Sequence, residues 1–477
     1  MTITTIDPAT GQPIATHEET SAAGVSVLLD RAREAAVRWA AVPPEGRAGS
    51  LRALAVALRS DAGALAALAT REMGKPLAES RAEVEKCAVA CDWFADHAPD
   101  LLRPEEVSTG ARRTRLAHHP LGVVLAIMPW NFPYWQVVRA LAPALAAGNG
   151  VVLKHAPSTT GCALALAGAA QRAGLPDGLF SVVVVSAERT DEVASGLIAD
   201  RRIAGVTFTG STRAGRAVAA RAGQALKKCV LELGGSDPFV VLADADLESA
   251  AAWAARSRFQ NAGQSCIAAK RIIVEEAIAD AFTDELLGHV RELRVGDPSD
   301  PGVTVGPLAR ADLRDAVERQ VRESERQGAR VLIGGEVPDR PGFFYLPTVL
   351  DEVEPGMPVL EEEVFGPAVP ILRARDAEHA LGLANQTDYG LGSAVWTSDL
   401  DRGEVLALRL EAGHTAVNGM TISDPRLPFG GTKESGYGRE LFRHGLLEFV
   451  NVHAIVVNGP HGPRRGPNDG QRVRGAK

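Results

Sequence analysis

Short apolar runs recur through the middle of the chain, and they constrain the fold more than any other feature of the sequence. Five of them occur at Leu121–Met128, Val151–Leu153, Phe180–Val185, Gly205–Thr209 and Pro238–Leu242. Ala-rich stretches of helical periodicity lie between them, for example Val137–Ala147. Short buried strands that alternate with helices are typical of a parallel sheet covered by helices on both faces. We therefore expect an α/β fold.

A second alternation of helices and strands follows residue 250. We expect helices at Ala251–Phe259, Ile278–Leu293, Asp376–Asn385 and Leu400–Glu411, and strands at Arg271–Val274, Val369–Leu372, Ser393–Thr397 and Thr415–Asn418. This pattern predicts a second α/β unit, and the break between the two units is expected near residues 233–235.

The first hundred residues have a helical pattern, with helices expected at Val25–Val42, Leu51–Met73 and Ala82–His97. The polar segment 111–120 is expected to form an extended hairpin that contacts a partner subunit. The last twenty residues, 458–477, are basic and contain Gly and Pro, which is typical of a solvated, flexible tail.

Composition narrows the class of protein. The chain has 477 residues, 45% of them hydrophobic, and a formal net charge of -8. This length allows about three domains of roughly 150 residues. The acidic balance argues against a nucleic-acid binder. No apolar run approaches the roughly 18 residues of a membrane span, and the first residues lack the apolar core of a signal peptide.

The five cysteines predict a reducing environment, because a secreted disulfide framework would have more of them. Cys87 and Cys91 lie in a predicted helix without a nearby Cys or His partner, so a metal site is not expected. Cys162 and Cys229 have apolar neighbours and are expected to pack in the core. Cys266 differs, because it follows a Gly-rich turn in the segment FQNAGQSCIAAKR and has small neighbours that leave room for a ligand. It is the candidate nucleophile.

Two other polar residues occupy positions suited to catalysis. Glu232, in VLELGG, is expected at a strand end, either as a solvated or salt-bridged carboxylate or as a partly buried general base. Asn131, in PWNFP, lies between two prolines that fix the backbone. This segment is either a rigid turn or a loop whose Asn side chain donates to a developing oxyanion.

Each of four further motifs is weak evidence of a binding site when it is taken alone. At FTGS, a strand is followed by Gly210 and Ser211 at the start of a predicted helix, where free N–H groups can bind phosphate. Lys154 ends a predicted strand in LKHAP, from which it could reach a ribose or phosphate. The segments EEEVFGP at 361–367 and PFGGTKESGYGRE at 428–440 are Gly-rich and charged, and each one alone is more typical of a surface loop.

The ordered set PWNFP, KHAP, FTGS, LELGG, GQSC, EEVFGP and PFGGTKESGYGRE resembles the aldehyde dehydrogenase superfamily over residues 5–455. The phrases LKHAP, LKKCVLELGGSDPF and ADADLE look like bacterial NAD(P)-dependent succinate-semialdehyde dehydrogenases of the shorter, Sad-like kind. The resemblance implies three parts. They are a Rossmann-type NAD(P)-binding domain (1–112 and 124–233), an α/β catalytic domain (234–430) and a small β oligomerisation element (113–123 and 440–457).

The resemblance also implies catalytic roles. Cys266 matches the nucleophile that adds to the aldehyde, which gives a thiohemiacetal and, after hydride loss, a thioester. Asn131 and the backbone N–H of Cys266 match the oxyanion donors. Glu232 matches the general base that activates water to hydrolyse the thioester, so hydrolysis is expected rather than transfer to coenzyme A.

The expected cofactor is NAD or NADP, with contacts implied by the resemblance. Lys154 and Glu363 match residues that hold the adenosine and nicotinamide riboses, and Trp130, Gly210, Ser211 and Leu233 match other parts of the cofactor cleft. In the family, a Glu three residues after this Lys chelates the adenosine ribose and repels a 2′-phosphate. Here that position is Pro157, so we expect both cofactors to be used. No metal is expected.

The substrate is expected to be succinate semialdehyde or a similar short ω-carboxylic aldehyde. Arg139 matches the Arg that holds the distal carboxylate in succinate-semialdehyde enzymes. A second Arg, common six residues before the Cys, is replaced here by Gln260. Arg426 is a candidate for the missing charge, and Ser423 is a candidate hydrogen-bond donor.

Alternatives to this substrate are glutarate semialdehyde, lactaldehyde or an aliphatic aldehyde. A catalytically inactive structural protein on the same fold is another alternative, as is cofactor-independent ester hydrolysis. We expect a cytoplasmic homodimer or homotetramer that binds neither nucleic acid nor membranes.

Overall fold

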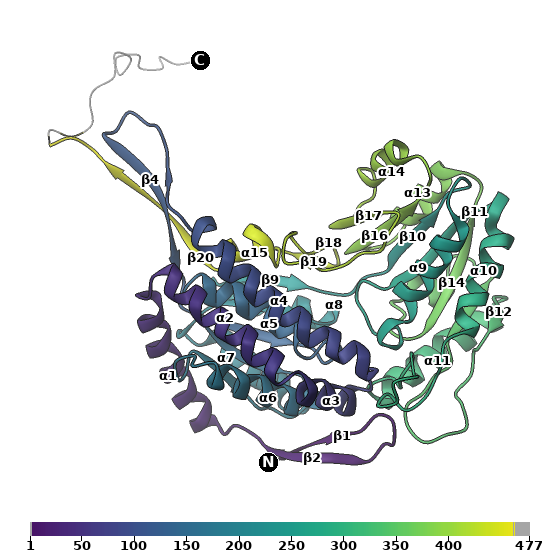
Figure 1. Ribbon diagram of the computed structural model, residues 1–477, viewed down its shortest axis with the longest axis horizontal. Helices are drawn as coiled ribbons and strands as arrows, with labels where there is room; N and C mark the ends of the chain where they lie inside the picture. Colours follow the sequence, from purple (N-terminus) through teal and green to yellow (C-terminus); the bar gives the residue numbers. More distant parts are fainter. Residues whose placement is uncertain (1, 461, 463–477) are drawn as a thin grey trace.

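The computed structural model describes residues 2–460 and 462, and its two large sheets lie in separate parts of the molecule (Figure 1). The first sheet has six strands in the order β19-β9-β8-β5-β6-β7. The strands are Gly436–Tyr437, Lys228–Glu232, Ile203–Thr209, Val123–Met128, Gly150–His155 and Phe180–Val183, given in the same order. All neighbours in it are parallel except β19, which runs antiparallel to β9.

Helices cover both faces of this sheet, as its continuous apolar strands require. Along β5, Ala126 and Met128 point into one core, and Val123, Leu125 and Ile127 point into the other. The surrounding helices are α1 (Ala22–Ala40), α2 (Pro44–Ser60), α3 (Ala62–Met73), α4 (Leu77–Leu101), α5 (Trp135–Ala146), α6 (Thr160–Arg172), α7 (Thr190–Ala199) and α8 (Thr212–Gln224).

The second sheet has seven strands in the order β12-β13-β14-β11-β10-β16-β17. They are Arg330–Ile333, Thr348–Asp351, Ala368–Ala374, Ala269–Glu275, Asp237–Val241, Gly392–Trp396 and His414–Val417. Its helices are α9 (Leu247–Phe259), α10 (Ala279–Arg291), α11 (Ala311–Arg326), α12 (Pro358–Glu361), α13 (Ala377–Asn385) and α14 (Leu400–Ala407). The chain passes from the first sheet to the second between Glu232 and Asp237.

A small three-stranded antiparallel sheet projects from the first part of the molecule (Figure 1). It joins β3 (Glu105–Glu106), β4 (Arg113–Pro120) and β20 (Val450–Val457), and α15 (Phe442–Glu448) leads into β20. The polar segment 111–120 therefore forms a hairpin with β3 and pairs on its other side with β20. A further short pair, β15 (Tyr389–Gly390) and β18 (Thr432–Lys433), lies near the second sheet.

The N-terminal region differs from the helical pattern expected for it. A hairpin of β1 (Thr2–Ile6) and β2 (Pro13–Glu18) precedes α1. The stretch expected as one helix, Leu51–Met73, forms α2 and α3, which meet at a 69° bend. Asp61, a residue of low helix propensity, lies at this bend and precedes the first residue of α3.

No single helix among residues 2–460 is both long and apolar enough to cross a membrane, although α2 and α3 meet that criterion as a bent pair. The tail predicted for 458–477 lies almost entirely outside the described residues.

Candidate active site

The first sheet presents its candidate residues at one edge. Asn131 follows β5, Lys154 lies near the end of β6, Gly210 follows β8, and Glu232 is the last residue of β9. These strands are parallel, so their carboxyl ends meet at the edge where open α/β sheets bind ligands.

The second sheet contributes loops that precede its strands. Cys266 lies between the short 3₁₀ helix η2 (Gln260–Gly263) and β11. The Asn261 side chain joins the two halves, because its Nδ2 donates to the carbonyls of Asn131 at 2.8 Å and Gln264 at 3.2 Å. Asn131 Nδ2 donates to the same Gln264 carbonyl at 3.1 Å. The Cys266 loop and the PWNFP loop are therefore fixed to each other.

Cys266 lies where two cavities meet. One is a cleft of about 350 Å³, whose walls include Trp130, Gly210, Ser211, Leu233 and Glu363. The other, which we call the small cavity, has a volume of about 90 Å³. Cys266 and Gln136 line both of them. A side chain between a large cleft and a small cavity can contact two different ligands at once.

The cleft brings together five of the seven residues predicted to bind the cofactor. Ser211 caps α8, where its side chain accepts from the Ala214 N–H, and Gly210 directly precedes it. At Gly234 an added Cβ would lie 2.5 Å from Glu363 Oε2, so glycine is needed for Glu363 to approach this closely. Lys154 is buried in β6, and Pro157 lines a separate cavity with Ser158 and Glu188.

The cleft has the features that a dinucleotide requires. It lies at the carboxyl edge of a parallel sheet, it contains the capped N-terminus of α8, and Gly234 lets Glu363 reach its wall. Trp130, Ser211 and Glu363 would hold such a cofactor, which supplies the hydride acceptor when it is bound.

The Cys266 thiol is protonated at neutral pH in the free protein. Burial raises its pKa to about 11, although the nearby cations Arg139 and Lys270 lower it and the carboxylates of Asp237 and Glu232 raise it. Since the thiolate is the nucleophile, the site must favour ionisation when substrate and cofactor bind.

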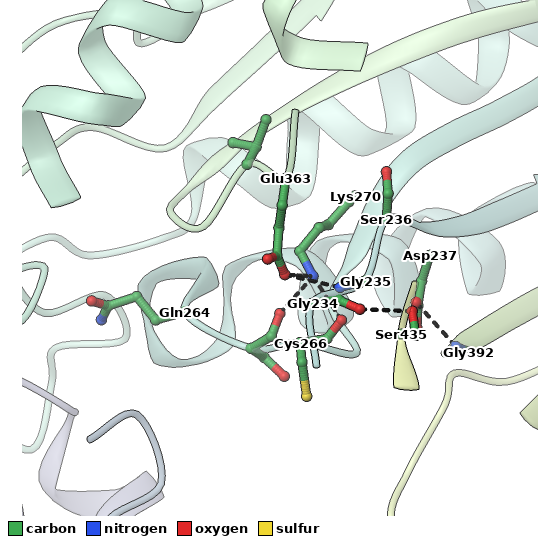
Figure 2. A network of polar contacts seen from close by, with 12 residues as sticks. Gly234, Gly235, Ser236, Asp237, Gln264, Cys266, Lys270, Glu363, Gly392 and Ser435 are labelled. Atoms are coloured by element: carbon green, nitrogen blue, oxygen red, sulfur yellow. Dashed lines mark hydrogen bonds and ion pairs between the residues drawn. The ribbon is translucent and has the colours of Figure 1, made fainter. Parts of the chain in front are cut away.

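Lys270 organises the Cys266 loop and was not singled out in the sequence. Figure 2 shows its side chain between Glu363 and the loop. Its Nζ donates to the carbonyls of Ser265 at 2.9 Å and Cys266 at 2.7 Å, and it pairs with Glu363 at 3.2 Å. Glu363 also accepts from the Gly235 N–H at 3.1 Å. The signal available in the sequence was a Lys four residues after the Cys, at the start of the short apolar run Ile272–Val274.

Glu232 is only 2% exposed, and neither of its carboxyl oxygens has a hydrogen-bond partner among the described residues. Burial and the nearby Glu440 raise its pKa well above the usual range, and Arg139 opposes this. Glu232 is therefore a buried carboxyl of raised pKa rather than a solvated strand-end residue. It lines neither cavity, but Gly430 lies beside it, where a Cβ would be 2.7 Å from its Oε1.

The substrate residues predicted from the sequence separate into two groups. Arg139 and Ser423 line the small cavity. Arg139 forms a buried ion pair with Glu440, and its Cζ lies 4.6 Å from the centre of the Phe429 ring. Arg426 is exposed, does not line the small cavity and donates to Asp424 at 2.6 and 2.9 Å.

Comparison with known proteins agrees with this geometry. The chain matches the aldehyde dehydrogenase family over residues 1–455. It is 46% identical to the succinate semialdehyde dehydrogenase [NAD(P)+] Sad of Escherichia coli over 450 residues, which are 94% of this chain and 96% of that one. It is 46% identical to a probable succinate-semialdehyde dehydrogenase [NADP(+)] of Synechocystis, over 96% of this chain and all of that one.

Solved structures give the same result. Succinic semialdehyde dehydrogenase from Streptococcus pyogenes, in complex with NADP+, superposes with a TM-score of 0.92 at 36% identity, over 96% of this chain and 100% of that one. Succinate-semialdehyde dehydrogenase from Burkholderia pseudomallei superposes with a TM-score of 0.93 at 36% identity, over 96% of this chain and 95% of that one. The chain belongs to the aldehyde dehydrogenase family.

Proposed function

We propose that the protein oxidises succinate semialdehyde to succinate with NAD or NADP. The observation that carries this proposal is the position of Cys266 at the junction of the cofactor-sized cleft and the small cavity. The relatives named above are succinate-semialdehyde dehydrogenases, and a cavity of about 90 Å³ suits a short substrate, since pockets for drug-sized ligands begin near 300 Å³.

The reaction begins at Cys266. Its thiolate adds to the aldehyde carbon and forms a thiohemiacetal, whose oxyanion needs hydrogen-bond donors. The Asn131 amide has two N–H donors and uses one on the Gln264 carbonyl, so the second is available. Loss of hydride from the thiohemiacetal carbon, which the bound cofactor would accept, would leave a thioester on Cys266.

Glu232 completes the turnover. It takes a proton from water, and the water oxygen attacks the thioester to release succinate and the Cys266 thiolate. A carboxyl that is buried without hydrogen-bond partners has a raised pKa, which makes it a stronger base once ionised. Lys270 acts as a positioning residue, because it fixes the Cys266 carbonyl and Glu363 together.

The use of both cofactors is supported by the NAD(P)+- and NADP(+)-dependent relatives named above, and the residue at position 157 agrees with it. A carboxylate at this position would repel the 2′-phosphate of NADP, and Pro157 carries no charge. All five cysteines are free, and Cys266 must stay reduced to act, which fits the cytoplasm. We propose a homodimer or homotetramer that associates through the small sheet, where Val452 and Val456 of β20 are exposed on an unpaired edge strand.

Initial-rate kinetics test the proposed function. Succinate semialdehyde, glutarate semialdehyde and butanal are compared with NAD and NADP at fixed enzyme concentration. The proposal expects the highest kcat/KM for succinate semialdehyde and turnover with both cofactors. A higher kcat/KM for either of the other aldehydes assigns a different substrate, and no turnover of any aldehyde would support a structural role.

A further inference from the structure

The turn that precedes Cys266 has a left-handed backbone. Asn261 and Ala262 each have a φ of 52°, with ψ values of 34° and 35°, and Gly263 has a φ of 74°. A non-glycine residue in this region is strained, because its Cβ lies close to the following carbonyl oxygen, and such strain persists only where surrounding contacts fix the backbone. Asn261 and Ala262 are 1% and 2% exposed. Two strained, buried residues in succession therefore indicate a turn that other groups hold in place.

Glu79 of α4 holds the first residue of this turn. Its Oε2 accepts from the Asn261 backbone N–H at 2.8 Å, although the two residues are 182 positions apart in the chain. Within the turn, Gln264 donates to the Asn261 carbonyl from its backbone N–H at 3.0 Å and from its side chain at 3.1 Å. On the opposite side, a Cβ at Gly263 would lie 2.3 Å from the Gly366 carbonyl oxygen. The turn is therefore fixed to α4 at its start and packed tightly at its end.

The turn determines where both proposed oxyanion donors lie. The Asn261 side chain donates to the Asn131 carbonyl at 2.8 Å, and Asn131 Nδ2 donates to the Gln264 carbonyl at 3.1 Å. The backbone N–H of Cys266, the second proposed donor, follows Gln264 by two residues. A rotation of the backbone at Asn261 would therefore displace both donors from the aldehyde oxygen. A displacement of about 1 Å can lower a rate by a factor of about 100.

A second carboxylate of α4 supports the neighbouring loop. Glu83 lies one helical turn after Glu79, and its Oε1 accepts from the backbone N–H groups of Tyr134 and Trp135, both at 2.8 Å. These two groups stand at the start of α5, directly after PWNFP. Side chains four residues apart lie on one face of a helix. One face of α4 therefore holds the loop that contains Asn131 and the turn before Cys266.

We propose that Glu79 is a positioning residue for the oxyanion hole: it holds the left-handed turn at Asn261 and thereby both donors, Asn131 and the Cys266 N–H. This inference rests on the proposed function, in which Asn131 is an oxyanion donor, but it applies to any aldehyde. Negative charge develops on the same oxygen when the thiohemiacetal forms and when the thioester is hydrolysed, so displaced donors slow both steps. Glu79 is not among the described residues that line the cleft or the small cavity, so it acts through the turn.

The test measures the pre-steady-state rate of NADH formation at saturating concentrations of the aldehyde that the wild type oxidises best. Glu79→Ala should lower this rate at least about tenfold and change KM for the aldehyde less than about twofold. Glu79→Gln, which retains an oxygen acceptor for the Asn261 N–H, should recover most of the rate. Glu85→Ala, which removes an exposed carboxylate of the same helix, is the matched control and should keep the wild-type rate. A wild-type rate in Glu79→Ala would overturn the assignment.

Two double variants separate positioning from a general loss of stability. Glycine adopts the left-handed backbone without strain, so Ala262→Gly should restore part of the rate that Glu79→Ala loses. In an Asn131→Ala background, Glu79→Ala should slow the reaction less than it does in the wild type, because one of the donors that it positions is already gone. The proposal is overturned if Ala262→Gly restores nothing, or if the loss is equal in both backgrounds.

The single variants distinguish the possible failures. If Asn131→Ala keeps the wild-type rate, the oxyanion role in the proposed function is wrong, and the role of Glu79 fails with it. If Asn131→Ala is slow and Glu79→Ala is not, the Glu79 assignment alone is wrong. Should Glu79→Ala fail to fold, Glu79→Asp decides, because its carboxylate is one methylene further from Asn261. A lower rate with unchanged KM would support the assignment, and a wild-type rate would overturn it.

Discussion

The guanidinium of Arg139 pairs with the carboxylate of Glu440 in the protein interior, where the two side chains are 2% and 5% exposed. Glu440 also accepts from Thr207 at 3.2 Å, and Arg139 donates to Thr209 at 3.4 Å. Glu232 lies close enough for both of them to influence its pKa. The three ionisable groups form one buried cluster that connects α5, β9 and the loop before α15.

This cluster predicts a structural cost for Arg139→Met. The substitution leaves Glu440 buried without its cation, and breaking a buried pair in this way costs about 3–5 kcal/mol. We expect a lower free energy of unfolding in urea by about that amount. The double variant Arg139→Met/Glu440→Gln should recover most of the loss. Equal stabilities of the wild type and Arg139→Met would contradict the buried pair.

The raised pKa of Cys266 predicts slow alkylation at neutral pH. Below a pKa of about 11, the thiolate fraction grows about tenfold for each pH unit. The rate of inactivation of the free enzyme by iodoacetamide should therefore rise about tenfold from pH 7 to pH 8, and again to pH 9. Alkylation of Cys266→Ala, followed by mass spectrometry rather than by activity, serves as the control and should be slow, because the other four thiols are buried. A rate that is already maximal at pH 7 would show a preformed thiolate.

Lys270 should affect both the thiol and the cofactor. In Lys270→Met, the Cys266 carbonyl loses its donor, Glu363 loses its partner, and a cation that favours the thiolate is removed. We expect kcat to fall by roughly 10- to 100-fold, and the rate of alkylation at pH 8 to fall with it. A lower kcat with an unchanged alkylation rate would show that Lys270 acts on the cofactor and not on the Cys266 thiol.

Residue 157 should control the choice between NAD and NADP. In Pro157→Glu, the new carboxylate would repel the 2′-phosphate, so KM for NADP should rise at least about tenfold. KM for NAD should change little or decrease. Pro157→Gln is the matched neutral control. If both variants raised KM for NADP equally, the shape of residue 157 rather than its charge would determine the choice between NAD and NADP.

Much of the architecture could be predicted from the local spacing of apolar residues along the chain. The apolar runs at 121–128 and 151–153 are parallel strands, because strands buried on both faces need continuous apolar sequence. The N-terminal hairpin was missed because Thr2–Ile6 has no apolar alternation. The bend between α2 and α3 was missed because the apolar spacing continues across it.

The candidate site could be predicted only where the sequence itself carries a motif. Cys266, Glu232 and Asn131 lie in such motifs. Lys270 does not, because a tertiary contact gives it its surroundings: it meets Glu363, which lies 93 residues further along the chain in the loop between α12 and β14. Arg139 could be placed near the substrate, but its neutralisation by Glu440 could not be predicted, since the two residues lie in different elements.

The most direct test of the central claim traps the thioester on Cys266. Glu232→Gln retains the side-chain volume but lacks the base, so each enzyme should reduce one equivalent of NAD with succinate semialdehyde and then stop. Mass spectrometry of the rapidly quenched enzyme should find a succinyl group on the peptide that contains Cys266. The account would be contradicted if one equivalent of NAD were reduced without this adduct, or if the succinyl group were found on another residue.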